Sequence, residues 1–287
     1  MKNEIASDSL TEISSDPVIR IEAARNWVSV DFQEIWDYRE LLYFLIWRDV
    51  KVRYKQTILG FGWALLQPLT TMVIFTVVFS WLLSSPSDGF PYPIFAFTAL
   101  LPWNYFAGAF SRATTGVVAE AGLISKVYFP RLIIPLAGVI SGFVDLAISF
   151  VVLLGMMIYY GITPHWGIIF LPAFLLLAAA TAFGVALWLS ALNARYRDIG
   201  QLIPFLIQVW MYASPIAYPV SKVPEKYRLI YSLNPMAGVI EGFRWGLLGK
   251  ETDSFSVIAI SSVVVLALLV SGLAFFKRME QTFADLL

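Results

Sequence analysis

The chain has 287 residues, of which 59% are hydrophobic and only 14% are charged, whereas about 25% charge is usual in a soluble domain. This composition excludes a disordered, collagen-like or disulfide-built protein and indicates a chain surrounded by lipid. The 20 basic and 20 acidic residues cancel, so no net positive field favours binding to nucleic acid. With no cysteine and a single histidine, His165, the chain can form no disulfide, thiolate metal site or multi-histidine metal site.

Long stretches without charge mark the predicted membrane spans. A helix needs roughly 20 apolar residues to cross about 30 Å of hydrocarbon. The segment Leu132–Ala194 carries one charge, Asp145, in 63 residues, which is enough for two helices with a turn near Gly161–Trp166. The sequence therefore predicts an all-α integral membrane protein with six transmembrane helices, at about residues 60–83, 93–113, 133–159, 168–192, 199–218 and 255–276.

An even number of spans places both termini on the same side of the membrane, and the basic residues indicate which side. Of the 20 Lys and Arg residues, 15 lie in the N-terminal segment, the loops after the second and fourth spans, and the C-terminal tail. Because short cytoplasmic loops are enriched in Lys and Arg, we expect both termini in the cytoplasm. The other five basic residues are Lys222, Lys226, Arg228, Arg244 and Lys250.

The segment before the first span is predicted to form an amphipathic interface helix, within residues 31–57. Aromatic side chains such as Trp36, Tyr43 and Trp47 recur at helical spacing on one stripe, and basic residues gather at its C-terminal end. Such a helix lies in the headgroup plane, either as a plain lipid-surface anchor or with its basic end also meeting a phosphorylated lipid substrate. The candidates for contact with the phosphate of such a lipid are Arg48, Lys51, Arg53 and Lys55.

Two further segments are helical without being spans. Thr115–Val127 is predicted to form a short cytoplasmic helix that ends before Phe129-Pro130, either as a connector or as a docking element for a cytoplasmic partner. On the other side, Pro224 and Pro235 predict two short helices, at about 224–232 and 235–248. These either dip into the outer leaflet and return, or form an ordinary interfacial pair. Glu241 and Arg244 in the second helix are an i,i+3 pair that can neutralise each other.

No catalytic or nucleotide-binding motif is present in the sequence. The string G-x-x-x-x-G-K-[ST] is missing, so the chain has no P-loop for ATP, and neither H-E-x-x-H nor G-x-S-x-G occurs. We therefore expect no catalytic residue, metal or cofactor in this chain. Asp145 is the only acid within a predicted span, which makes it either a functional residue or a carboxylate paired within the bundle. Gly138-x-x-x-Gly142 lies on the same predicted helix as Asp145 and permits close contact with another helix.

Aromatic residues make up 16% of the chain, and many lie near the predicted membrane edges. Most fit the aromatic belt of a membrane protein. A minority could instead line a conduit, because aromatic faces stack on the C–H surfaces of sugars. With the external pair Glu241 and Arg244, the conduit or gate candidates are Trp63, Trp103, Tyr105, Tyr212 and Tyr218.

Three segments resemble one family of membrane proteins. Trp36–Pro68, WDYRELLYFLIWRDVKVRYKQTILGFGWALLQP, is similar to the entrance motif of polysaccharide-exporting ABC transporter permeases. Gly122–Pro135, GLISKVYFPRLIIP, resembles the cytoplasmic coupling region of that family, and Leu233–Arg244, LNPMAGVIEGFR, resembles its external segment. The motifs keep the family's order and spacing, and the resemblance is strongest to O-antigen exporters, with teichoic-acid and capsule exporters as near relatives.

The resemblance implies a fold and a set of partners. It implies a homodimer that binds two copies of a separate P-loop ATPase, which holds ATP and Mg, in the bacterial inner membrane. It divides the chain into a variable cytoplasmic tail (1–30), the interface helix (31–57) and a transmembrane domain (58–287). Within that domain it implies a coupling helix at about 115–128 and external gate helices at about 224–248. The residues expected to couple to the ATPase are Glu120, Leu123, Lys126 and Tyr128.

The implied function is export of a polysaccharide linked to undecaprenyl diphosphate, without enzymatic activity in this chain. Two alternatives stay open. An ABC exporter for a smaller lipid or drug would share the number of helices but would not need a conduit for sugar chains. A membrane-embedded transferase would need a constellation of catalytic acids or histidines, which Asp145 and His165 do not supply.

Overall fold

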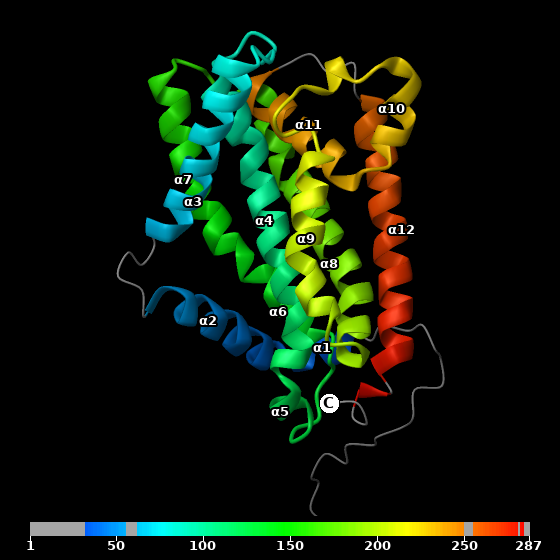
Figure 1. The fold of residues 1–287 in the computed structure, drawn as a ribbon. Helices are drawn as coiled ribbons and strands as arrows, with labels where there is room; N and C mark the ends of the chain where they lie inside the picture. The colour runs from blue at the N-terminus through cyan, green and yellow to red at the C-terminus, as the bar shows by residue number, and fades with distance from the viewer. Residues whose placement is uncertain (1–31, 56–61, 250–254, 281, 284–287) are drawn as a thin grey trace, which may run out of the picture.

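The computed structural model describes residues 32–55, 62–249, 255–280 and 282–283, and these residues form helices joined by short turns (Figure 1). No strand occurs within these ranges. The predicted tail 1–30 and the end of the predicted interface helix at Gln56 lie outside the described residues. An all-helical fold, as the sequence predicts, is confirmed for the described part of the chain.

Four helical stretches in the described chain are long and apolar enough to cross a membrane, and they coincide with four of the six predicted spans. The first is Leu65–Leu82, within α3 (Gly62–Phe75) and the π-helix η1 (Thr76–Leu82). The others are made of α6 (Ile133–Ile140) with α7 (Gly142–Tyr159), η2 (Trp166–Phe170) with α8 (Leu171–Arg195), and α12 (Phe255–Glu280).

The remaining two predicted spans correspond to helices of a different character. α4 (Tyr92–Ala119) has 28 residues, about 42 Å at 1.5 Å per residue, but its polar side chains make it less apolar than the four stretches above. It lies at the centre of the bundle and packs against α6, α7, α8 and α11. α9 (Ile199–Tyr212) is apolar but has only 14 residues, about 21 Å, and the chain after it is irregular up to Pro219.

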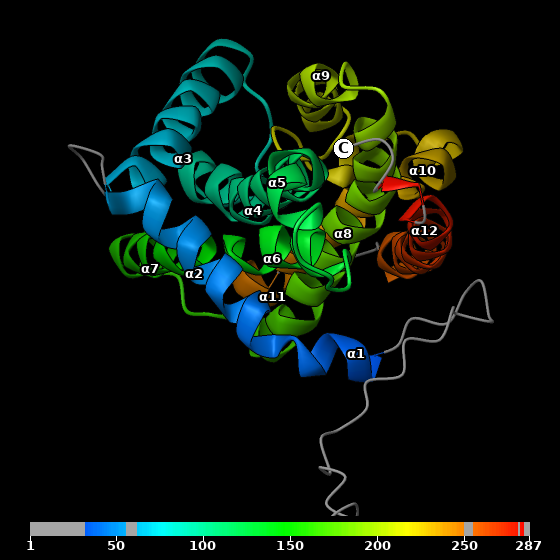
Figure 2. The same cartoon turned by 90° about the horizontal axis from the view of Figure 1, so that it is seen from below.

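The segment before α3 lies across one end of the bundle, which we name the α2 end (Figures 1 and 2). It consists of α1 (Phe32–Asp37) and α2 (Arg39–Lys55), separated by a turn at Tyr38, where one continuous helix was expected. Leu45 anchors α2 in a buried apolar cluster shared with α4, α6, α8 and α12. The aromatic stripe faces away from this cluster, since Trp36, Tyr43 and Trp47 are exposed.

At the α2 end, the predicted helix 115–128 is not a separate element. Its first residues belong to α4, which continues to Ala119, and a four-residue helix α5 (Ala121–Ile124) follows. The helix that contains the predicted second span therefore continues to Ala119, past the predicted bound near residue 113. The physical reason is Arg112, whose charge is accommodated between helices, so the helix need not end where that charge occurs.

At the opposite end, α10 (Glu225–Ser232) and α11 (Pro235–Leu248) agree with the two predicted short helices. Pro235 occupies the first turn of α11, where its missing N–H is not needed, and the Asn234 side chain accepts a hydrogen bond from the N–H of Met236. Gly249 ends the helix with φ +70°, a conformation that glycine adopts without strain. The third short helix at this end is η3 (Val220–Lys222).

Candidate functional site

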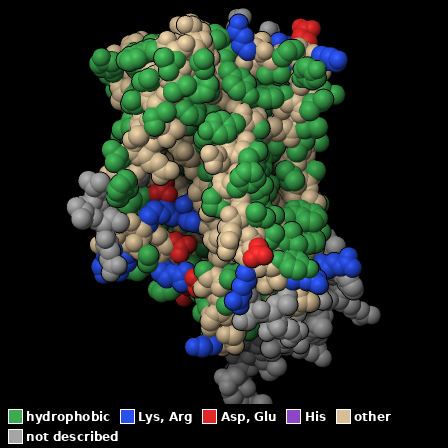
Figure 3. Space-filling model, in the orientation of Figure 1, with side chains coloured by type: hydrophobic (Ala, Val, Ile, Leu, Met, Phe, Trp, Pro, Cys, Tyr) green, Lys and Arg blue, Asp and Glu red, His purple; other side chains and the backbone are tan. Residues whose placement is uncertain are grey.

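Two cavities lie between α2 and the helices of the bundle. The first, of about 410 Å³, lies between α2, α4 and α6, and we name it the α2–α6 cavity. The second, of about 340 Å³, lies between α2, α3, α4 and α7, and we name it the α3–α7 cavity. Arg53 and Arg112 line both. The space-filling view shows acidic and basic side chains gathered in a hollow at this level, on a face that is otherwise largely hydrophobic (Figure 3).

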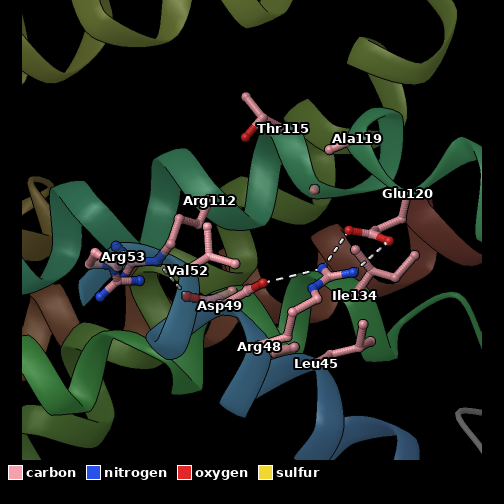
Figure 4. A pocket seen from close by; sticks show the side chains of 13 residues that line it. Leu45, Arg48, Asp49, Val52, Arg53, Arg112, Thr115, Ala119, Glu120 and Ile134 are labelled. Carbon is pink, nitrogen blue, oxygen red and sulfur yellow. Dashed lines mark hydrogen bonds and ion pairs between the residues drawn. The ribbon is translucent and has the colours of Figure 1, made fainter. Parts of the chain in front are cut away.

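Arg48 connects α2 to the end of α4 across the α2–α6 cavity (Figure 4). Its two terminal nitrogens donate to the two carboxylate oxygens of Glu120, at 3.0 and 2.5 Å, and Nη2 also lies 3.2 Å from Asp49. The hydrogen bonds with Glu120 raise the pKa of Arg48 above its usual value, so the guanidinium stays charged. Glu120 directly precedes α5, so this bidentate pair joins α2 to the segment where α4 ends.

Asp145 forms the second connection between α2 and the bundle. It lies in the first turn of α7, accepts a hydrogen bond from the hydroxyl of Tyr54 and forms an ion pair with Arg53. Burial, followed by the hydrogen bond to Asp145, raises the pKa of Tyr54 to about 12, so its hydroxyl is a neutral donor at physiological pH. The only acid in a predicted span is therefore paired, and its partners come from a helix that precedes it by about 90 residues.

Arg112 on α4 approaches the same carboxylate, with 3.8 Å between its Nη1 and Asp145 Oδ2. Its Nε donates to the carbonyl of Gly138 at 3.1 Å. A methyl group on Gly108 or Gly142 would come within 2.9 and 2.5 Å of the guanidinium, so glycines form the walls of its slot. The close helix contact expected from Gly138-x-x-x-Gly142 is confirmed, and it serves to hold an arginine.

The four basic candidates on α2 divide into two groups. Arg48 and Arg53 turn toward the bundle, as described above. Lys51 and Lys55 are exposed, and the Lys51 ammonium lies 3.9 Å from the centre of the Trp47 ring. Arg48 and Arg53 thus line the cavities, whereas Lys51 and Lys55 lie on the outer surface of α2.

The four candidates for coupling lie around α5 at the α2 end. Glu120 binds Arg48, and Leu123 packs against the buried cluster that holds Leu45. Lys126 and Tyr128 are exposed, and the Tyr128 hydroxyl lies 3.4 Å from Glu34 on α1. The exposed part of this segment and α1 therefore share one surface.

The aromatic candidates are spread over three environments. Trp63 and Tyr105 line the α3–α7 cavity, and the Tyr105 ring stacks on Phe143 with 5.0 Å between centroids. Trp103 is buried in the core, and Tyr212 is exposed on α9. The Tyr218 hydroxyl accepts a hydrogen bond from Tyr231 at 3.2 Å, at the far end of the molecule.

Glu241 and Arg244 pair with each other, as their spacing predicts, but both side chains are buried, with 1% and 2% of their surface exposed. Arg244 donates to the carbonyl of Ile216 at 2.9 Å, and its guanidinium lies 3.7 Å from the centre of the Phe95 ring. In the described chain this pair holds the irregular segment after α9 against α4 and α11. It therefore lines no open surface of the single chain.

Three positions that the structure brings into the cavities or into contacts between helices are absent from the sequence-based candidates. Two of them, Arg112 and Asn104, line the α3–α7 cavity. Asn234 was also missed: its side chain accepts from Trp210 at 2.9 Å and donates to Ala213 and Ser214 at 3.0 Å, which ties α9 to the start of α11. Polar residues in otherwise apolar helices are the signal that could have found the first two.

Comparison with known proteins gives a consistent assignment. The family model described as ABC-2 type transporter matches residues 40–248. The chain is 31% identical over 252 residues to the O-antigen export system permease protein RfbA of Klebsiella pneumoniae, covering 86% of this chain and 95% of that protein. The protein of the same name from Myxococcus xanthus is 27% identical, covering 87% and 96%. The polysialic acid transport protein KpsM of Escherichia coli is 21% identical, covering 83% and 92%.

Proposed function

Since the chain belongs to the ABC-2 type transporter family, as its membrane permease subunit, we propose that it exports a polysaccharide with the help of a separate ATPase. The relatives that cover nearly the whole chain are named for export of O-antigen and transport of polysialic acid, and both are polysaccharides. The observation that carries the proposal is that this likeness extends through α2 and α11, where the chain is most unlike a simple bundle of spans. The finer substrate that we propose is an O-antigen-like glycan on an undecaprenyl diphosphate carrier.

We propose that α4 and α9 complete a set of six spans. The central position of α4 explains its polar residues, because they face other helices rather than lipid. α9 is short, but in the irregular chain after it the carbonyls of Ala213 and Ile216 accept hydrogen bonds from Asn234 and Arg244, which supports the segment without a longer helix. With six spans the α2 end is cytoplasmic, and both termini lie on that side, as the distribution of basic residues favours.

The assembly that we propose is a homodimer bound to two ATPase subunits in the inner membrane. α5 and the exposed residues Lys126 and Tyr128 would form the contact with the ATPase. Because Glu120 starts this segment and binds Arg48, a displacement of α5 would be passed to α2. ATP and Mg would be held by the partner, since this chain has no P-loop.

Deletion of the gene tests the function. We expect loss of surface polysaccharide and accumulation of lipid-linked glycan inside the cell, with restoration by the intact chain. A strain that keeps its surface glycan but loses the export of a small lipid or drug would favour the smaller-substrate alternative. Transferase turnover by the purified chain, without an ATPase, would favour the enzyme.

A charge-reversal series tests the role of α2 in recognising the lipid diphosphate. Arg48→Glu, Lys51→Glu, Arg53→Glu and Lys55→Glu are expected to reduce export, most strongly for the two arginines that face the hollow. If all four variants assemble with the ATPase and export normally, α2 does not contact the phosphate groups.

A further inference from the structure

Two arginines and one acid line the α3–α7 cavity. Its charged lining residues within the described chain are Arg53, Arg112 and Asp145. The Asp145 carboxylate lies near both guanidiniums. It forms an ion pair with Arg53 and accepts a hydrogen bond from the hydroxyl of Tyr54. Arg112 stays at 3.8 Å, beyond direct hydrogen-bonding distance. Asp49 lines the adjoining α2–α6 cavity, which shares both arginines, so within the α3–α7 cavity itself Asp145 is the acid that faces them.

An unpaired donor lines the same cavity. Asn104 on α4 is one of its lining residues, and the Nδ2 atom of its side chain is buried without a hydrogen-bond partner among the described residues. A buried N–H without an acceptor is costly, and such groups are rare unless a ligand or water completes them. The missing partner is therefore an acceptor, and the guanidiniums of Arg53 and Arg112 line the same cavity.

One hydrogen bond and two glycines position the Arg112 guanidinium in the single chain. Its Nε is bound to the carbonyl of Gly138, and the slot between Gly108 and Gly142 has no room for even a methyl group. A guanidinium held this way loses little further freedom when an anion binds. Arg112 lines the cavity, and its Nη1 and Nη2 form no short hydrogen bond that the structure records, so both keep donors for an oxyanion.

The walls of the cavity indicate what carries the anion. Beside the polar residues, it is lined by Trp63, Pro68, Leu101 and Leu146, and Trp63 is largely exposed at the outer surface. The cavity thus combines an oxyanion site with an apolar, membrane-facing side. A free inorganic anion would use only the first of these features, whereas the headgroup of a lipid would use both.

We propose that the α3–α7 cavity binds the phosphate group of a lipid, with Arg53 and Arg112 as charge partners and Asn104 as a neutral donor. This rests on the proposed function for its membrane setting and adds Arg112 and Asn104 to the residues that recognise the headgroup. The phosphate can come from a polyprenyl diphosphate carrier or from an anionic membrane phospholipid.

Native mass spectrometry of the purified full-length chain tests the site. The probes are farnesyl diphosphate and phosphatidylglycerol, with farnesol as the uncharged control. We expect Arg112→Gln to weaken binding of the phosphate lipids about tenfold, and Asn104→Leu about fivefold. Arg197→Gln removes an exposed arginine far from the cavity and should leave binding unchanged. Preference for one probe identifies the source of the phosphate.

Asn104→Leu separates ligand binding from a structural role. Because the Asn104 Nδ2 has no partner in the described chain, its loss should leave the thermal unfolding midpoint unchanged or raise it. A variant that unfolds earlier but binds as tightly as the wild type would overturn the proposal, as would failure of both phosphate lipids to bind. If lipid binding depends on Asn104 but deletion of the gene leaves the surface glycan unchanged, the lipid site stands and the proposed export function is refuted. If lipid binding does not depend on Asn104 but deletion of the gene abolishes the surface glycan, the export function stands and the lipid site is refuted.

Discussion

Gly138 is the residue whose replacement should be most informative about how the helices meet. A methyl group there would lie 2.8 Å from the backbone nitrogen of Ala113, and the backbone of α4 cannot move aside as a side chain could. We expect Gly138→Ala to cost about 1–3 kcal/mol of unfolding free energy, seen as a lower thermal midpoint in detergent. Gly155→Ala on α7 is the matched control, because a methyl group there meets nothing within 4 Å. Equal midpoints for the two variants would contradict this packing.

At the scale of residues, the sequence predicts which side chains are unusual but not whom they meet. Asp145 stands out because it is the one Asp, Glu, Lys or Arg in the 63 residues from Leu132 to Ala194. Its partners Arg53 and Tyr54 are more than 90 positions away, and Arg48 binds Glu120 across 72 positions. Such pairs depend on how the helices are stacked, which a local pattern does not encode. The Glu241–Arg244 pair could be predicted as a contact because it is local to one helix turn.

The connection between α2 and α4 is the element-scale feature on which coupling depends. A double-mutant cycle with Arg48→Gln and Glu120→Gln should show a coupling free energy of about 1 kcal/mol for stability, since both side chains are partly exposed and solvent screens the pair. Export should fall in each single variant, because α2 is released from the segment that precedes α5. Strictly additive effects on both stability and export would show that the two residues act independently.

α11, at the end opposite α2, contains the buried Glu241–Arg244 ion pair, so loss of one partner should cost more stability there than at the partly exposed Arg48–Glu120 pair. Arg244→Met leaves Glu241 buried without its cation, at a cost of about 3–5 kcal/mol. The double variant Glu241→Leu with Arg244→Met should recover most of the loss in thermal unfolding, since neither charge then remains. Lys226→Met, on the exposed surface of α10, is the control and should have little effect. A stable Arg244→Met single variant would show that the buried pair does not hold α11.

Elements with strong local signals were predicted closely, and the others were not. α11 begins at a proline and ends before a glycine with positive φ, and its predicted bounds agree with the structure. α2 was predicted from its aromatic stripe, but Leu45 and its neighbours face the bundle while Trp47 stays exposed. The stripe shows that α2 is amphipathic without telling which apolar face meets protein. α4 extends beyond the predicted span to Ala119, since the charge of Arg112 lies between helices and does not end the helix.

For the whole molecule, the six-span topology can be checked with single cysteines, because the natural chain has none. Ser125→Cys in the α5 segment and Lys222→Cys in η3 place one thiol at each end, at exposed positions. We expect a membrane-impermeant maleimide to label Lys222→Cys in intact spheroplasts and Ser125→Cys only after permeabilisation. The unmodified chain serves as the blank. Labelling of both sites from the outside would rule out the proposed orientation.

The assembled exporter lies beyond what one chain can show, because its dimer and ATPase contacts involve other molecules. The most direct measurement uses inverted membrane vesicles that contain this chain, its ATPase partner and a lipid-linked glycan. We expect ATP to move the glycan into the lumen, where added glycosidase no longer degrades it. An ATPase variant without hydrolysis should give no protection. A glycan that remains fully degradable with the active, assembled complex and ATP would contradict the proposed function.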